Sequence, residues 1–345
     1  MRRLSIYICL LFAMTVTGQT DVFRKAIQTA YNTGTAESQY KVASLYWKGG
    51  ETPFETDDYI HWLTLAARQG HRQAMTDLAS RYTTGILGNY VIILNPNYRE
   101  ALVWWEKVQD YFMMSKIYAQ GGYGVQKDVS KALENAEKAA NKNGGLAFFV
   151  AEMYEAKTVS DKVTNDIKTW YNALRGSVTV NKTKSFRFYK INADQTNDEY
   201  SCVTVAEKYV KGEGVTQNIP AAKVYFEKAG RDGLVREAML FAFGSNPRSN
   251  PYIGKNLSEK DVTYIQGFAV QPDFKTAHEA VDKAILLDKN KPASLAHDYN
   301  LKGVIYMAQG NEYEALRMYG KVLDLNSRYF KENESALHIA LFSNQ

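Results

Sequence analysis

Residues 118–140 read YAQGGYGVQKDVSKALENAEKAA and contain the pattern from which the fold of the chain is predicted. A tyrosine is followed three residues later by Gly121, then by a glycine-rich connection, and then by a run with alanines at helical spacing. Glycine ends helices because it adopts left-handed backbone conformations without a steric penalty. Small residues on one helix face let a neighbouring helix approach closely. The stretch therefore predicts the end of one helix, a short loop and a second helix.

The same pattern recurs along the chain at a constant interval. Four tyrosines, here called the period tyrosines, follow one another at intervals of 36 residues: Tyr46, Tyr82, Tyr118 and Tyr154. Tyr209 begins a further copy. Glycine follows three residues later at positions 49, 85, 121 and 212, and an alanine or serine stands three residues before each tyrosine. These offsets place an apolar residue, a small residue and the tyrosine on one buried helix face. A fixed period of this length indicates a repeat architecture.

A second helix is expected after each first one. Aromatic residues stand sixteen positions after three of the tyrosines, at Trp62, Trp170 and Tyr225. An insert of about six residues around Asn95–Asn97 precedes the second helix of the copy that begins at Tyr82. Between Trp170 and Tyr209 the interval is broken. Residues 184–194 fit a second-type helix and residues 177–180 fit a short strand, so the order of helix types there stays open.

The stretches 118–140 and 209–229 resemble those of the Sel1-like repeat proteins, which are relatives of the tetratricopeptide family. The resemblance rests on Tyr-x-x-Gly, then Gly-Val, then a helix with Lys-Ala, and it covers roughly residues 20–245. It implies an all-α fold, an α/α superhelical solenoid of antiparallel helix pairs that turns right-handed. Each pair shares its core with its neighbours because it cannot bury its own apolar face. The array is expected to begin with half a unit, a helix over residues 22–33 followed by Gly34.

Three regions follow from this pattern. Residues 1–18 are predicted to be a signal peptide, residues 19–245 the Sel1-like array with an irregular insert near 174–200, and residues 246–345 tetratricopeptide-like repeats with a C-terminal cap over 331–345. A proline- and glycine-containing connector over 246–256 separates the last two. The C-terminal repeats rest on residues spaced as in a tetratricopeptide repeat: Ala280, Ala284, Leu287, Pro292, Leu301, Gly303, Tyr306, Ala315, Tyr319 and Val322.

The N-terminus and the cysteines predict where the protein works. Arg2 and Arg3 precede an apolar run over residues 4–16 that is too short to span a membrane comfortably, and cleavage is expected before Gln19.

The remaining chain has 40 basic and 37 acidic residues with no basic run, which does not favour nucleic acid as a partner. It has one cysteine, Cys202, and thus no internal disulfide. We expect export to a bacterial periplasm or cell surface, with no membrane span after signal removal.

No pattern of catalytic or metal-binding residues stands out. The five histidines include no pair at the i, i+4 spacing of a helical zinc site. Cys202 lies on an apolar helix face and reads as an inert buried thiol, with no base nearby in the sequence. A serine nucleophile motif and a phosphate loop are both missing, and Gly121–Gly124 fits the loop between two repeat helices. No cofactor, no metal and no enzymatic activity are expected.

A candidate binding surface follows from offsets on the first helix of each pair. The tetratricopeptide-like resemblance implies that positions six and two residues before the period tyrosine, and one after it, line a concave groove. The candidates are Tyr40, Ser44, Trp47, Thr76, Ser80, Thr83, Phe112, Lys116, Phe148 and Glu152. Aromatic side chains exposed in a groove are typical of binding surfaces. The alternative is that these side chains pack between helices, in which case Tyr40, Phe112 and Phe148 would be almost completely buried.

The expected function is therefore that of an exported, non-catalytic repeat scaffold that binds a protein or an extended peptide in its concave groove. The alternative is an enzyme, or a protein that binds a glycan or a small molecule, through the irregular region 174–200. The sequence leaves the partner, the face that binds it and the oligomeric state open.

Overall fold

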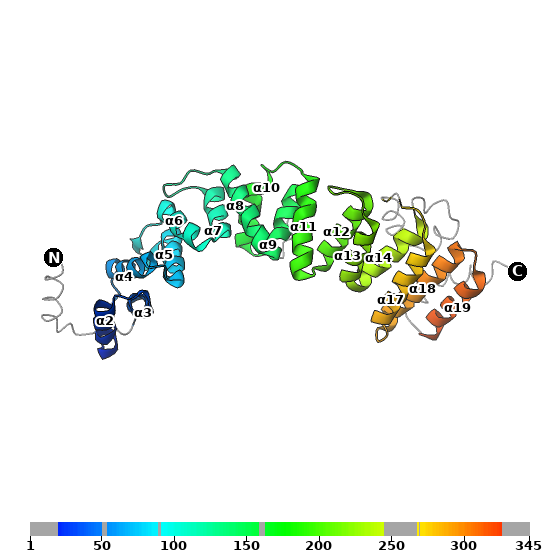
Figure 1. Cartoon of the computed structure of the whole chain (residues 1–345), viewed down its shortest axis with the longest axis horizontal. Coiled ribbons are helices and arrows are strands. Elements are labelled where there is room, and N and C mark those ends of the chain that lie inside the picture. The colour runs from blue at the N-terminus through cyan, green and yellow to red at the C-terminus, as the bar shows by residue number, and fades with distance from the viewer. Residues whose placement is uncertain are drawn as a thin grey trace. The chain divides into compact units, whose positions relative to one another are not determined.

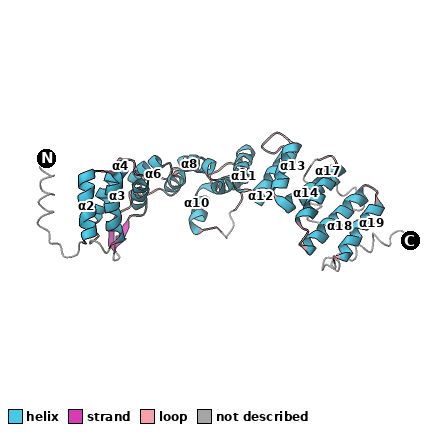
Figure 2. Cartoon of the chain, turned by 60° about the horizontal axis from the view of Figure 1, so that its bottom comes forward, coloured by secondary structure: helices cyan, strands magenta, loops and turns pink. Residues whose placement is uncertain are grey.

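The computed structural model describes residues 20–49, 54–88, 91–158, 163–244, 268 and 270–325. These residues form 16 helices and one two-stranded sheet (Figures 1 and 2), which confirms the predicted all-α repeat fold. The chain divides into two compact units, Met1–Ala139 with Asn172–Leu174, and Ala140–Tyr171 with Arg175–Gln345. The predicted signal peptide, connector and C-terminal cap lie outside the described residues.

The first unit is a succession of helices in which each packs against the next along the chain. Its helices are α2 (Asp21–Thr33), α3 (Ala36–Lys48), α4 (Thr56–Arg68), α5 (Arg72–Thr84), α6 (Tyr98–Val108) and α7 (Tyr111–Gln120). The division between the units falls within α8 (Val129–Lys142). Phe23, Tyr46, Trp62 and Trp104 are buried in a core that runs through neighbouring helices. The predicted half unit is confirmed as α2, which ends at Gly34 in the left-handed conformation.

The second unit continues the same packing. It contains α9 (Gly144–Tyr154), α11 (Lys182–Thr196), α12 (Glu199–Lys211), α13 (Ile219–Lys228), α14 (Gly230–Phe243), α17 (Phe274–Leu287), α18 (Pro292–Ala308) and α19 (Glu312–Asp324). It also contains α10 (Asn165–Arg175), except for Asn172–Leu174, which belong to the first unit. α9 packs on α11, and α14 packs on α17 across the longest connection in the unit. Cys202 is buried on α12, with its Sγ 3.9 Å from the carbonyl oxygen of Ala193 on α11.

A recurring backbone hydrogen bond defines the repeat. The carbonyl oxygen of an aromatic residue in the last turn of the first helix accepts from the backbone N–H of the residue that precedes the second helix. The donor–acceptor pairs are Asn97–Tyr82 at 2.7 Å, Asp128–Tyr118 at 2.9 Å, Asn181–Tyr154 at 3.0 Å, Asn218–Tyr209 at 3.0 Å and Asp273–Phe241 at 2.7 Å. In each pair the donor also caps the second helix, because its side-chain oxygen accepts from the amide three residues on. We call this backbone hydrogen bond the Tyr–cap bond, also where phenylalanine takes the place of tyrosine.

The Tyr–cap bond shows which helix pairs with α9 in the irregular region. Asn181 pairs with Tyr154, so α11 is the second helix of that pair and the predicted second-type helix over 184–194 is confirmed. The expectation that the helix around Trp170 takes this place is wrong, because α10 is an addition within the connection between α9 and α11. The alternative that residues 177–180 form a short strand is not observed, since residues 178–180 have no regular structure.

The strands lie instead in the insert after α5. β1 (Ile86–Gly88) pairs antiparallel with β2 (Val91–Leu94), shown in magenta in Figure 2, and the chain then enters α6 through Asn97. The insert around Asn95–Asn97 was expected, whereas the hairpin was not, because its two strands comprise only seven residues.

The glycines after the period tyrosines have positive φ angles, as predicted, but three of them are not left-handed helical. Gly212 has φ 71° and ψ 29°, which is the expected conformation. Gly49, Gly85 and Gly121 combine φ of 68–72° with ψ near 180°. That region of backbone conformation is open essentially only to glycine, so these positions depend on glycine more strongly than a left-handed cap does.

Most residues of the predicted C-terminal tetratricopeptide pattern are buried. Leu301, Ala315, Tyr319 and Val322 are buried where α18 packs on α19, whereas Leu287 is exposed. α17 is the second helix of the pair that begins with α14, since Phe241 makes the Tyr–cap bond to Asp273. Phe241 and Gly244 thus repeat the aromatic-x-x-Gly spacing of the period tyrosines.

Candidate functional site

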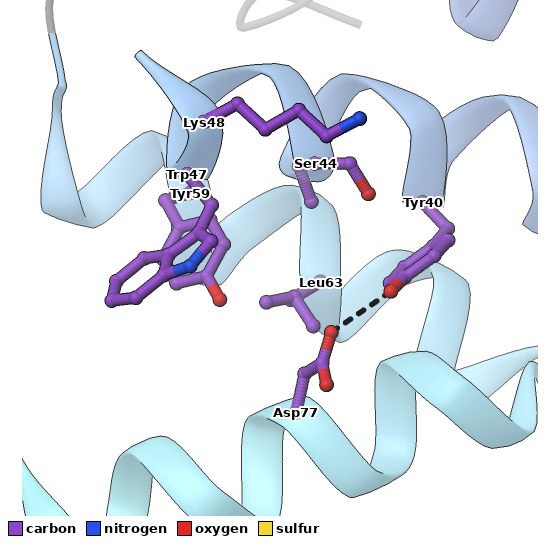
Figure 3. Close-up of a pocket in the computed structure, with 8 residues that line it drawn as sticks. Tyr40, Ser44, Trp47, Lys48, Tyr59, Leu63 and Asp77 are labelled. Carbon is purple, nitrogen blue, oxygen red and sulfur yellow. Dashed lines mark hydrogen bonds between the residues drawn. The ribbon is translucent and has the colours of Figure 1, made fainter.

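Three of the ten predicted groove residues meet in one pocket of the first unit. The pocket has a volume of about 150 Å³ and lies among α3, α4 and α5 (Figure 3). Tyr40, Ser44 and Trp47 line it from α3, with side chains one helical turn apart on a single face. The remaining lining residues are Ala43, Lys48, Tyr59, Leu63 and Asp77. The pocket is therefore built by a complete helix pair and the first helix of the next pair.

One wall of the pocket is polar. The Tyr40 hydroxyl donates to Oδ2 of Asp77 at 2.9 Å, drawn as the dashed line in Figure 3, and Gln73 Nε2 donates to Oδ1 at 2.8 Å. The Tyr40 ring stacks on His71 with 4.4 Å between ring centroids. Burial and the hydrogen bond to Asp77 raise the pKa of Tyr40 above its usual value, so Tyr40 stays a neutral donor. This wall offers a fixed carboxylate to a ligand that donates hydrogen bonds.

The opposite wall is aromatic. The Trp47 indole stacks on Tyr59 with 5.4 Å between ring centroids, and the guanidinium of Arg81 lies 3.6 Å from the centre of the Trp47 ring. Arg81 also donates from Nε to the Tyr59 hydroxyl at 3.3 Å. Trp47 nevertheless remains 46% exposed. The indole is thus held in place by its neighbours and still accessible to a partner.

The other predicted residues do not line this pocket. Thr76, Ser80 and Thr83 lie half-buried on α5, where Thr83 Oγ1 accepts from the indole Nε1 of Trp105 at 2.9 Å. On α7, Phe112 and Lys116 are half-buried, with the lysine Nζ 5.6 Å from the centre of the phenylalanine ring. Tyr40, Phe112 and Phe148 are all half-buried, so the near-complete burial that would contradict the groove is not observed. A groove joining them stays a prediction.

Phe148 and Glu152 lie in the second unit, within what we call the Lys157 cluster: Phe148, Glu152, Lys157, Tyr189 and Tyr200. Lys157 Nζ donates to the hydroxyls of Tyr189 at 2.9 Å and Tyr200 at 2.8 Å, and lies 3.3 Å from Glu152 Oε1. Glu152 is buried and accepts a hydrogen bond from the Tyr189 hydroxyl. Burial acts to lower the pKa of Lys157, but the bond to Tyr200 and the charge of Glu152 raise it overall.

The helix offsets read from the sequence missed the partners that complete both sites. Asp77 follows predicted Thr76 on the same helix, and it faces the pocket that its neighbour does not line. Tyr59 belongs to a second-type helix, which the offsets do not cover. Lys157, Tyr189 and Tyr200 lie outside the helix offsets altogether. One signal could have identified Asp77 from the sequence. It is the acidic residue at the position five before the period tyrosine, where the other copies have Lys41, Met113 and Phe149.

Within the described ranges, no group of three or more His, Cys, Asp or Glu side chains is arranged to hold a metal ion. No helix there is long and apolar enough to cross a bilayer. The region 174–200 consists of the end of α10, a short connection, α11 and the start of α12, and Phe188 and Tyr189 of α11 are buried in packing.

Comparison with known proteins identifies the repeat. The Sel1 repeat model matches residues 36–57, 60–71, 72–107, 109–144 and 205–234. A protective antigen of uropathogenic Escherichia coli with an SLR fold is 20% identical, with 88% of this chain and 71% of that chain covered and a TM-score of 0.31. A Sel1 repeat protein from Oxalobacter formigenes is 16% identical, with 95% and 93% covered and a TM-score of 0.45. No curated protein matches the chain significantly.

Proposed function

This chain carries Sel1 repeats within residues 36–144 and over residues 205–234, and from that premise we propose that the protein is an exported, non-catalytic scaffold that binds a protein or an extended peptide. Sel1 repeats typically serve as protein-interaction scaffolds. Stacked helix pairs offer a long, preformed surface, which suits recognition of an extended chain better than the enclosure of a small substrate.

The observation that carries the proposal is that the exposed indole of Trp47 and the carboxylate of Asp77 line opposite walls of one pocket. Tryptophan is enriched among the residues that dominate binding energy, especially where its neighbours hold it rigid. Tyr59 and Arg81 fix the Trp47 ring, so binding costs little side-chain entropy. A partner can place an apolar side chain against the indole and donate a hydrogen bond to Asp77. The pocket therefore fits one side chain and the adjoining backbone of a peptide.

Replacing Trp47 by alanine tests the pocket. Cross-linked capture from the envelope fraction of the source organism, with the full chain as bait, should identify a partner by mass spectrometry. We expect Trp47→Ala to reduce its recovery at least about tenfold, as for a central aromatic in an interface. Tyr313→Ala removes an aromatic side chain that is 73% exposed on α19 and serves as the matched control. If Trp47→Ala retains helicity and captures the partner as the natural chain does, the pocket is not the binding site.

Export is supported by Arg2 and Arg3 followed by the apolar run over residues 4–16. We expect the mature protein to be recovered from the periplasm or the cell surface with Gln19 as its first residue. Fractionation of the source organism followed by N-terminal mass spectrometry measures this directly. Recovery of the chain from the cytoplasm with its first 18 residues intact would contradict it.

A further inference from the structure

The Lys157 cluster has the chemistry of an occupied ligand site. We propose that it is a binding site for a primary alkylammonium group, of the kind that a lysine side chain carries, and that Lys157 fills this site until a partner's lysine replaces it. The site lies entirely within the second unit and shares no residue with the Trp47 pocket.

The geometry matches the three N–H donors of a primary ammonium. Three acceptors surround Lys157 Nζ, namely the hydroxyl oxygens of Tyr189 and Tyr200, at 2.9 and 2.8 Å, and Glu152 Oε1 at 3.3 Å. An ammonium has three donors and no acceptor, so each N–H finds a partner. Each acceptor comes from a different helix, Glu152 from α9, Tyr189 from α11 and Tyr200 from α12. The acceptors are therefore held in place by the packing of these helices.

The site requires a cation. The Glu152 side chain is only 10% exposed, and a buried carboxylate is costly unless a positive charge and hydrogen bonds compensate it. Tyr189 donates to the carboxylate and accepts from the ammonium, which links the two charges. Burial and the bond to Glu152 raise the pKa of Tyr189, so this hydroxyl keeps its proton. Any group that replaces Lys157 must bring a positive charge.

Lys157 is attached in a way that permits exchange. It lies in the irregular segment after α9, beside Ala156 with φ 56°, and its side chain is 38% exposed. Its backbone is anchored separately, because its N–H donates to Glu152 O at 3.1 Å and its carbonyl accepts from the Tyr171 hydroxyl at 2.7 Å. Rotation of the side chain thus frees the acceptors without breaking backbone hydrogen bonds. Tyr200 is 49% exposed, which leaves the site open to solvent on that side.

A second lysine in the same unit, Lys208, is more enclosed than Lys157. Lys208 Nζ lies 2.7 Å from Glu155 Oε1, but its side chain is only 6% exposed and projects from the last turn of α12. A lysine enclosed in this way cannot leave its carboxylate without displacing the side chains around it. The exposure and the irregular backbone at Lys157 therefore distinguish an exchangeable occupant from a structural ion pair.

The arrangement also predicts which cations are rejected. The ammonium is held by hydroxyl and carboxylate oxygens, with Nζ 5.2 and 5.3 Å from the centres of the two tyrosine rings. A quaternary ammonium has no N–H to donate and would leave the Tyr200 hydroxyl and Glu152 without a donor. The site should therefore prefer primary amines, unlike the aromatic cages that select quaternary ammonium groups.

Calorimetric titration of the full chain with n-butylammonium tests the site. Lys157 competes as a tethered ligand at high effective concentration, so Lys157→Ala is expected to bind n-butylammonium at least about tenfold more tightly than the natural chain. Lys157→Met keeps an unbranched apolar side chain over the site and is the matched control, with no gain expected. Butyltrimethylammonium should not bind Lys157→Ala. Adding Glu152→Gln to Lys157→Ala should weaken n-butylammonium binding at least about tenfold.

Equal affinity of n-butylammonium for Lys157→Ala and the natural chain would overturn the inference, as would equal binding of the quaternary amine. If Lys157→Ala does not fold alone, n-butylammonium should restore folding by occupying the empty site, and failure of that rescue overturns the inference as well. Acetyl-Gly-Lys-Gly-amide and 1,4-diaminobutane separate a peptide lysine from a free amine: tighter binding of the peptide supports a partner's lysine, and tighter binding of the diamine overturns that part. These titrations need no partner, so they succeed or fail independently of the Trp47 experiment.

Discussion

Replacing Gly85 by alanine is expected to lower the free energy of unfolding of the first unit by about 4 kcal/mol. Gly85 ends α5 with φ 72° and ψ −174°, a conformation that costs an alanine about 1–3 kcal/mol. A Cβ at this position would also lie 2.5 Å from the carbonyl oxygen of Leu94. Leu94 pairs with Ile86 in the hairpin, so its backbone cannot move away without breaking the β1–β2 ladder.

Gly49→Ala is the matched control for this substitution. Gly49 has nearly the same backbone angles, φ 68° and ψ 180°, but no atom of the residues that the structure describes lies within 4 Å of the position that a Cβ would take there. We therefore expect only the conformational cost, about 2 kcal/mol. Urea unfolding followed by circular dichroism measures both variants. Equal losses for the two would show that contact with the hairpin contributes nothing.

Replacing Glu155 by glutamine is expected to cost the second unit about 3 kcal/mol. Glu155 Oε1 lies 2.7 Å from Lys208 Nζ and accepts from Ser185 Oγ at 2.5 Å, while Oε2 lies 2.7 Å from Lys182 Nζ. Removing the carboxylate charge leaves the buried ammonium of Lys208 with only Glu213, 3.4 Å away. Breaking one partner of a buried pair is costly because the remaining charge is desolvated without compensation.

The same carboxylate predicts how stability changes with pH. Burial acts to raise the pKa of Glu155, but hydrogen bonds from Lys182, Lys208 and Ser185 lower it to about 2. The unfolded chain has the ordinary value of 4.5, so the stabilisation is complete above that pH and is lost as the pH falls from 4.5 to 2. Unfolding of Glu155→Gln should depend less on pH in this window. Glu134→Gln, in an exposed pair with Lys138, should change stability by less than about 0.5 kcal/mol. Parallel acid profiles for Glu155→Gln and the natural chain would contradict the assignment.

The sequence predicted the repeat where each copy keeps its spacing. The constant interval between period tyrosines, with glycine three residues later, located the helix ends because both residues act within one helix. The interval could not predict the order of helix types between Tyr154 and Tyr209, because the added helix α10 separates Tyr154 from its hydrogen-bond partner Asn181 in the sequence. The equivalent role of Phe241 was not predicted for a similar reason, since its hydrogen-bond partner Asp273 lies 32 residues later in the sequence.

The candidate sites were predicted in part. Offsets along α3 brought Tyr40, Ser44 and Trp47 to one face, and the structure places all three in one pocket. Such offsets describe a single helix, so they could not supply Asp77 from the next pair or Tyr59 from the second helix. Glu152 was expected on an open border and is buried instead, because tyrosines from α11 and α12 reach over it.

The burial of Cys202 between α11 and α12 gives the chain an internal kinetic probe. Burial raises the pKa of this thiol, so it reacts with a labelling reagent only after the neighbouring helices separate. In a Cys9→Ser background it is the single thiol of the chain. Its labelling rate in the absence of denaturant then reports how often α11 and α12 separate, and these two helices also supply Tyr189 and Tyr200 to the Lys157 cluster.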